Sequence, residues 1–179
     1  MLRFCRSNLV PWGCLAFLPA AVIACSCLES TVEQSSARSG LVFVASVIEE
    51  DPPEPYYSYV RGESVLTESS ADMVRWLMVP SRGWKGVPGE TLAVYSPASG
   101  ASCGYRFEVG SQYLVYAQIA KRSGGGWASN FGWPKDAVFP AATTFLCDRT
   151  RPMESAGEDL AALGDPVWSR EHVSDPPKK

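Results

Sequence analysis

The chain has 179 residues, of which 46% are hydrophobic and 20% are charged, and this is enough for one globular domain. Its formal net charge is −3, and no long run of basic residues interrupts the sequence. These two features exclude the basic surface that nucleic-acid-binding proteins need, so we expect no nucleic-acid partner.

Residues 1–24 are predicted to be a secretory signal peptide. Arg3 and Arg6 give a positively charged start, and an apolar stretch follows up to the small residue Ala24, which suits a cleavage site. This stretch is short for a spanning helix, although an uncleaved membrane anchor is the alternative. Cleavage would leave a secreted or periplasmic chain that begins at Cys25, with 14 basic and 19 acidic residues.

The first third of the mature chain is predicted to form a short helix and a long strand. Ser30 and Glu33 have the spacing of a capping box, which marks the start of a helix. Residues 41–48 form an apolar, β-branched run that predicts a strand buried on both faces for part of its length. Residues 49–70 then form a long excursion. Its tyrosines, Tyr56, Tyr57 and Tyr59, either extend a β-ribbon or form an aromatic contact loop.

Further strands are predicted over residues 71–80, 91–95, 112–119, 127–132 and 141–147. Pro80 should close the first of these, and Trp84 should lie in the turn that follows it. Ser155 and Glu158 predict a second capping box and a helix that Gly164 ends. Residues 164–179 are predicted to be a disordered tail.

This order of elements predicts a mainly β fold over residues 25–163. Five or six short strands with long connections and one or two short helices are typical of a small five-stranded barrel of the OB-fold type. We expect one such domain and a monomer.

Four cysteines remain after the leader: Cys25, Cys27, Cys103 and Cys147. An even number in an exported protein predicts two disulfides. A bridge between Cys25 and Cys27 is geometrically unfavourable, because only one residue separates them. Two pairings remain open, and each fastens the N-terminus to two distant parts of the chain. The spacing does not match a structural zinc site, so we expect no metal of the protein's own.

The sequence offers little for catalysis. The only histidine is His172, in the predicted tail, so a histidine base, a nucleophile–histidine pair and a histidine zinc site are all lacking. The glycines at 124–126 lack the lysine and the strand–helix context of a phosphate-binding loop. We therefore expect no enzymatic activity and no cofactor.

Several segments resemble the tissue inhibitors of metalloproteinases and the wider netrin-like domain family. The most specific is Cys25-Ser26-Cys27 directly after the leader. Residues 95–104, 113–115 and 146–148 resemble the family's bridged loop, the strand after it and the second partner cysteine. The resemblance covers residues 25–163. A third bridge and a second, smaller domain are missing, and in this the chain is similar to bacterial, single-domain members.

The resemblance implies a mode of action. It joins Cys25 to Cys103 and Cys27 to Cys147, and it assigns to the backbone amine and carbonyl of Cys25 the chelation of a target protease's zinc. Ser26 would enter the specificity pocket. The rest of the implied inhibitory edge is Cys27, Leu28, Ser99, Gly100, Ala101 and Ser102. The implied partner is a zinc metalloprotease, contacted in trans.

Two departures and two rival readings accompany this expectation. Glu29 stands where the inhibitors usually have proline, and Ser26 lacks the methyl group of the usual threonine. Residues 22–25 also resemble a bacterial lipobox, in which Cys25 would be lipidated and would anchor the protein to the cell envelope. An unpaired cysteine would then remain, which counts against this reading. The chain could also be a non-inhibitory binding module that uses the Tyr56–Tyr59 loop or another face.

Overall fold

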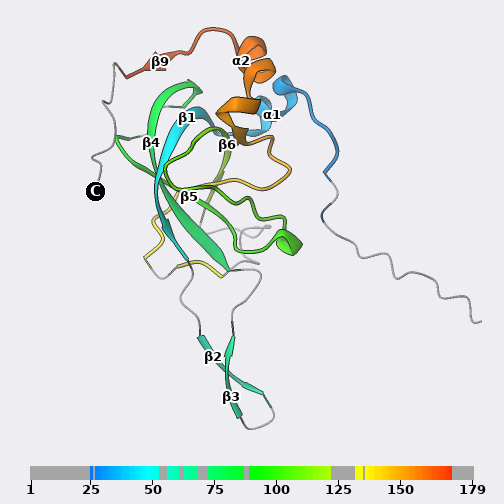
Figure 1. Ribbon diagram of the computed structural model, residues 1–179, viewed down its shortest axis with the longest axis vertical. Helices are drawn as coiled ribbons and strands as arrows, with labels where there is room; N and C mark the ends of the chain where they lie inside the picture. The colour runs from blue at the N-terminus through cyan, green and yellow to red at the C-terminus, as the bar shows by residue number, and fades with distance from the viewer. Residues whose placement is uncertain are drawn as a thin grey trace, which may run out of the picture.

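A computed structural model describes residues 25, 27–52, 56–60, 63–67, 72–86, 89–121, 132–134 and 136–170 (Figure 1). The strands are β1 (Leu41–Asp51), β2 (Tyr56–Val60), β3 (Glu63–Thr67), β4 (Met73–Lys85), β5 (Leu92–Pro97), β6 (Gln112–Ala120), β7 (Ala141–Thr143), β8 (Arg151–Pro152) and β9 (Trp168–Ser169). The helices are α1 (Val32–Arg38) and α2 (Gly157–Leu163), with 3-10 turns η1 (Gly100–Ser102) and η3 (Met153–Ser155).

Five strands close into a barrel. Their order is β1-β4-β5-β7-β6, and β6 pairs with β1 again to complete the circle. Every pairing in the circle is antiparallel except that of β5 with β7, which is parallel. The prediction of a mainly β, OB-fold-like five-stranded barrel with two short helices is confirmed.

The first strand lies between two apolar layers, which explains its unbroken hydrophobic sequence. Phe43, Ala45 and Val47 point into the barrel, where they pack with side chains such as Trp76 and Val115. The alternate residues Val42 and Val44 point outward and pack against a second cluster that includes Ala156 and Leu160. Because neighbouring side chains on a strand face opposite ways, both faces are buried here. This confirms the prediction for residues 41–48.

The fourth strand continues through its proline, so the predicted stop at Pro80 is wrong. Pro80 pairs with Ala45, and the next paired residues are Arg82 and Val44, so the register shifts at this point. A bulge tolerates proline, because the missing N–H does not interrupt a regular ladder there. The strand therefore runs on to Lys85, and Trp84 lies within it instead of in a turn.

The two helices lie together at one end of the barrel (Figure 1). Helix α1 begins one residue later than predicted: Thr31 is the N-cap, and its capping-box partner is Gln34. Helix α2 has Ala156 as its N-cap and no side-chain cap, so the predicted capping box of Ser155 and Glu158 is wrong. The prediction that Gly164 ends the helix is confirmed. Neither described helix has the length and apolarity needed to span a membrane.

The excursion after β1 contains a hairpin of β2 and β3 that forms its own two-stranded sheet (Figure 1). The side chains of Tyr56–Tyr59 lie outside the described part, so neither reading of their role is tested. Most of the predicted strand over 127–132 also lies outside it. The strand predicted over 141–147 ends at Thr143, because the chain turns at residues 145–148.

The prediction of a disordered tail from residue 164 is wrong for the part that is described. Strand β9 pairs with β4 at Arg82 and Gly83. The Trp168 ring covers Gly83 so closely that a Cβ there would come within 2.6 Å of it, and its Nε1 donates to the carbonyl oxygen of Gly86 over 2.8 Å. This segment was predicted to be disordered from its composition. It is ordered because the Trp168 ring packs on the barrel and the backbone pairs with β4. The domain therefore includes residues 164–170.

Candidate functional site

The predicted inhibitory edge begins at the first described residue. Cys25 is bridged to Cys103 and Cys27 to Cys147, with Cα–Cα distances of 5.6 and 5.1 Å. These are the pairings that the family resemblance implies. Ser26 lies outside the described residues. The bridge occupies the Cys25 sulfur atom, to which a lipid would be attached.

The topology of the barrel explains why one short N-terminal segment can reach both partner cysteines. Strands β5 and β7 run parallel, so the loops that follow them leave from the same end of the barrel. Cys103 lies in the first loop and Cys147 in the second. The Leu146 N–H donates to the carbonyl oxygen of Cys103 over 2.8 Å, and Gly104 and Phe145 form an isolated bridge. The two loops therefore form one platform for the N-terminus.

The loop after β5 is tightly wound. The carbonyl oxygen of Ser99 accepts from the N–H groups of Ser102 and Gly104, at 3.1 and 2.9 Å, and residues 100–102 form η1. Cys103 has left-handed backbone angles, with φ at 59°. The Sγ atom of Cys25 lies 3.7 Å from the Ala101 carbonyl oxygen, a contact without a donor because a bridged sulfur carries no hydrogen. The structure thus brings the predicted edge residues 99–102 against Cys25.

We expect Gly104→Ala to cost about 1 to 3 kcal/mol of the free energy of unfolding, because a Cβ forces backbone atoms apart. That Cβ would lie 1.9 Å from the carbonyl oxygen of Pro97 and 2.8 Å from that of Ser99. Gly100→Ala is the matched control in the same loop, since a Cβ there meets nothing within 4 Å. Urea denaturation of both variants checks this. Equal stability losses in the two would contradict it.

The loop after β7 is fixed by one carboxylate. Asp148 accepts from the backbone N–H of Phe145 and from Nε2 of Gln118, both at 2.9 Å. Burial raises the pKa of Asp148, and these hydrogen bonds oppose that shift. The contacts tie the turn around Cys147 to strand β6, so the second anchor of the N-terminus is attached to the barrel itself.

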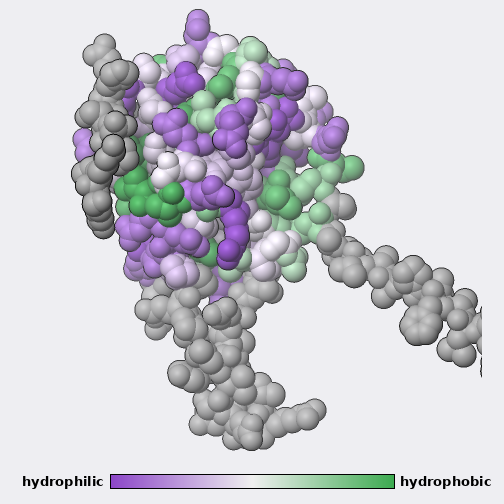
Figure 2. All heavy atoms as spheres, in the orientation of Figure 1, coloured by the Kyte–Doolittle hydropathy of each residue, from purple (hydrophilic) through white to green (hydrophobic). Residues whose placement is uncertain are grey.

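An exposed apolar surface continues from the bridges. Leu28 is 92% exposed and Leu146 is 46% exposed. Figure 2 shows an apolar area on the side of the molecule where the described chain begins. Both leucines line a groove of about 780 Å³. It is lined by residues 27–33 and by Leu146, Cys147, Arg149, Arg151, Glu158 and Ala162.

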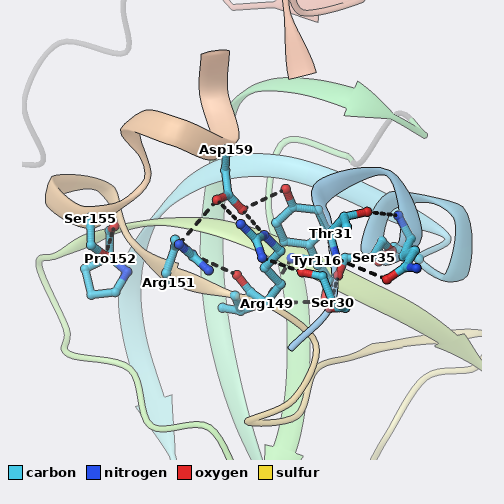
Figure 3. Close-up of polar contacts among 12 residues, drawn as sticks. Ser30, Thr31, Ser35, Tyr116, Arg149, Arg151, Pro152, Ser155 and Asp159 are labelled. Atoms are coloured by element: carbon cyan, nitrogen blue, oxygen red, sulfur yellow. Dashed lines mark hydrogen bonds and ion pairs between the residues drawn. The ribbon is translucent and has the colours of Figure 1, made fainter. Parts of the chain in front are cut away.

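A buried ionic cluster lies behind this groove, and the sequence did not predict it (Figure 3). Asp159 of α2 is fully buried. Its carboxylate accepts from Nε and Nη2 of Arg149 at 2.7 and 2.9 Å, and from the Tyr116 hydroxyl at 3.1 Å. Nη1 of Arg151 lies 3.2 Å from it. Nη1 of Arg149 donates to the carbonyl oxygen of Ser30, in the N-terminal segment.

Burial and hydrogen bonding account for the acid–base properties around this cluster. Burial raises the pKa of the Tyr116 hydroxyl, and the neighbouring carboxylate of Asp159 raises it further. The pKa of Glu33, at the rim of the groove, is lowered by hydrogen bonds from its own backbone N–H and from the Thr31 hydroxyl, and by the charge of Arg149. The cluster carries two guanidinium groups and one buried carboxylate.

One sequence signal could have revealed this cluster. Ala156, Asp159, Leu160 and Leu163 follow the i, i+3, i+4, i+7 spacing of a buried helix face, so Asp159 occupies an apolar position. A carboxylate at such a position needs cationic partners, and arginines at 149 and 151 are the near candidates. In the described part of the chain, no three His, Cys, Asp or Glu side chains gather that could hold a metal ion.

Comparison with protein-family models and with curated proteins finds no match to this chain.

Proposed function

We propose that this chain is a non-enzymatic, exported inhibitor of a zinc metalloendopeptidase, similar to the tissue inhibitors of metalloproteinases. It would act by inserting its mature N-terminus into the protease's active site. The observation that carries the proposal is the double attachment of Cys25 and Cys27 to two adjacent loops. The proposal also rests on cleavage of the leader after Ala24.

Zinc chemistry supports this use of the N-terminus. Catalytic zinc in such proteases keeps an open position that holds water. The α-amine and carbonyl oxygen of Cys25 would replace that water as a compact chelate. A free α-amine has a pKa of about 7.7 to 8.0, so its neutral, metal-binding form costs little at neutral pH. Ser26 would point into the specificity pocket.

The bridges would also lower the entropic cost of binding. A free N-terminal segment loses conformational freedom when it enters a cleft, and an already fixed segment loses much less. Leu28 and residues 99–102 lie beside the bridged cysteines and would contact the rim of the protease cleft. Lipidation of Cys25 would use the same sulfur as the bridge and would block its amine, so it is incompatible with this function.

A second candidate function has one observation of its own. The β2–β3 hairpin forms a separate sheet and extends away from the barrel, at the end opposite the helices (Figure 1). Projecting loops carry binding surfaces more often than scaffolds do. In this reading the chain is a non-inhibitory binding module, and its N-terminal bridges serve stability only.

One added residue separates the two candidates. An alanine inserted before Cys25 moves the α-amine away from its chelating position without changing either bridge. We expect inhibition of zinc metalloendopeptidases to weaken about a hundredfold or more, because a metal ligand is lost. The measurement is residual cleavage of a fluorogenic peptide by a panel of purified zinc endopeptidases, titrated with each form of the protein.

The control is the mature protein with the same alanine added after Lys179, which should inhibit as the unmodified protein does. Circular dichroism should report the same thermal unfolding for all three forms. Undiminished inhibition by the N-terminally extended form would refute zinc chelation. Absence of inhibition by the unmodified protein across the panel would favour the binding module.

A further inference from the structure

We infer that Arg149 is a positioning residue that holds the N-terminal edge in place. Its guanidinium attaches the N-terminal segment at Ser30, in addition to the disulfides at Cys25 and Cys27. The inference deepens the proposed function and rests on it for its inhibitory consequence, but its structural content can be tested without any protease.

The attachments at Cys27 and Ser30 lie on either side of an exposed part of the edge. Cys27 is bridged to Cys147, and three residues later the carbonyl oxygen of Ser30 accepts from Nη1 of Arg149. The anchors are also close in sequence, since Arg149 follows Cys147 by two residues. Only Leu28 and Glu29 lie between the attachments, and both are exposed. Leu28, at 92% exposure, has almost no contact of its own to hold it.

Arg149 can serve as an anchor because its own position is fixed. Two of its nitrogens bind the carboxylate of Asp159, which is fully buried. Tyr116, on barrel strand β6, donates to the same carboxylate. A bidentate guanidinium–carboxylate pair fixes the plane of the guanidinium, and this directs the remaining Nη1 toward Ser30 (Figure 3).

The backbone of Arg149 supports a specific role. Its φ is 69°, in the left-handed region that side chains other than glycine and asparagine rarely adopt. Such a conformation persists only where surrounding contacts impose it. Here the left-handed conformation directs the Arg149 side chain from the loop after β7 toward both Asp159 and the N-terminal segment. An arginine that only pointed into solvent would not need this conformation.

Arg151 is a natural comparison within the same cluster. Its Nη1 lies 3.2 Å from the same carboxylate, and its Nε donates to the carbonyl oxygen of Arg149 over 3.3 Å. The two arginines therefore contact the same buried carboxylate, and each carries one positive charge. Of their described hydrogen bonds, the one to the N-terminal segment belongs to Arg149.

The test compares Arg149→Met with Arg151→Met in the mature, bridged protein. Each removes one cation from Asp159, so both should lower the thermal stability. The positioning role affects only the edge: backbone ¹⁵N order parameters of Leu28 and Glu29 should fall below about 0.6 in Arg149→Met and stay near 0.85 in Arg151→Met. Arg149→Lys, which keeps the charge but cannot reach both partners, should resemble Arg149→Met and serves if that variant fails to fold.

Inhibition provides an independent measurement. Loss of a hydrogen bond from a charged group should weaken inhibition about tenfold to a hundredfold in the Arg149 variants and leave the Arg151 variant unchanged. Equal order parameters in the Arg149 and Arg151 variants would overturn the inference, whatever the inhibition. If the unmodified protein inhibits no zinc endopeptidase, the proposed function fails, and the order parameters still decide the role of Arg149.

Discussion

Removal of the longer bridge, in the variant Cys27→Ala/Cys147→Ala, should lower the free energy of unfolding by about 5 kcal/mol. The bridge joins residues 120 positions apart, and the entropy that such a crosslink removes from the unfolded chain gives this magnitude at 25 °C. Because a domain of this size is stable by only about 5 to 15 kcal/mol, the loss is a large fraction of the total. Guanidinium denaturation under oxidising conditions measures it.

The companion variant Cys25→Ala/Cys103→Ala removes a bridge that spans 78 positions and should lose slightly less, about 4.5 kcal/mol. The protein with all four cysteines replaced should match the reduced wild-type protein. This control separates loss of the crosslink from effects of the alanines themselves. If either double variant lost less than about 1 kcal/mol of the free energy of unfolding, restraint of the unfolded chain would not be the source of the bridge's stabilisation.

Replacement of the buried carboxylate, in Asp159→Ala, should cost about 3 to 5 kcal/mol. The carboxylate is fully buried and binds two guanidinium groups whose side chains are only 19% and 29% exposed. Its loss leaves Arg149 and Arg151 with unpaired charge in a poorly solvated site and leaves the Tyr116 hydroxyl without its acceptor. Urea denaturation at neutral pH, monitored by tryptophan fluorescence, provides the measurement.

Asp136→Ala is the matched control. Asp136 also pairs with an arginine, Arg75, at the short distance of 2.6 Å, but its side chain is 65% exposed. Water screens such a pair, so its loss should cost less than about 1 kcal/mol. Similar costs for the two alanine variants would show that burial does not control the strength of these ion pairs.

The strands were the most predictable part of the fold. The run from Leu41 to Ala45 is apolar at every position, and Val42, Phe43, Val44 and Ala45 are buried, as expected for a strand that is covered on both faces. Local chemistry also determined the glycine that ends α2, because Gly164 adopts a positive φ that few other residues accept. These features depend on a few neighbouring residues, so the sequence displays them directly.

Features that depend on a partner strand were predicted less well. Proline normally ends a strand, but Pro80 lies where β1 and β4 shift register, so its missing N–H interrupts nothing. The tail composition around Asp165 predicted disorder. Trp168 nevertheless packs against Gly83 of β4, and this contact exists only in the folded barrel.

The candidate site likewise has one part that the sequence predicted and one part that it did not. Cysteine parity restricted the bridges to two pairings, and the family resemblance selected one of them. The barrel topology explains why one short segment can reach both partners: the parallel pairing of β5 and β7 brings Cys103 and Cys147 to the same end. The cluster of Arg149 and Asp159 was missed, although Asp159 occupies an apolar position of the α2 pattern. Its contact with the N-terminal segment appears only when the loop after β7, helix α2 and that segment pack together.

The sequence by itself therefore determined the fold class, the even set of cysteines and the segment that the bridges fasten, because each follows from composition or from spacing along the chain. The tertiary structure decided how that segment is held. Burial of Asp159 makes its pairing with Arg149 obligatory. The remaining guanidinium nitrogen then contacts Ser30, which lies 119 positions away in the sequence. The apolar helix position of Asp159 signals the need for a cationic partner, but the contact of Arg149 with Ser30 arises only from packing in three dimensions.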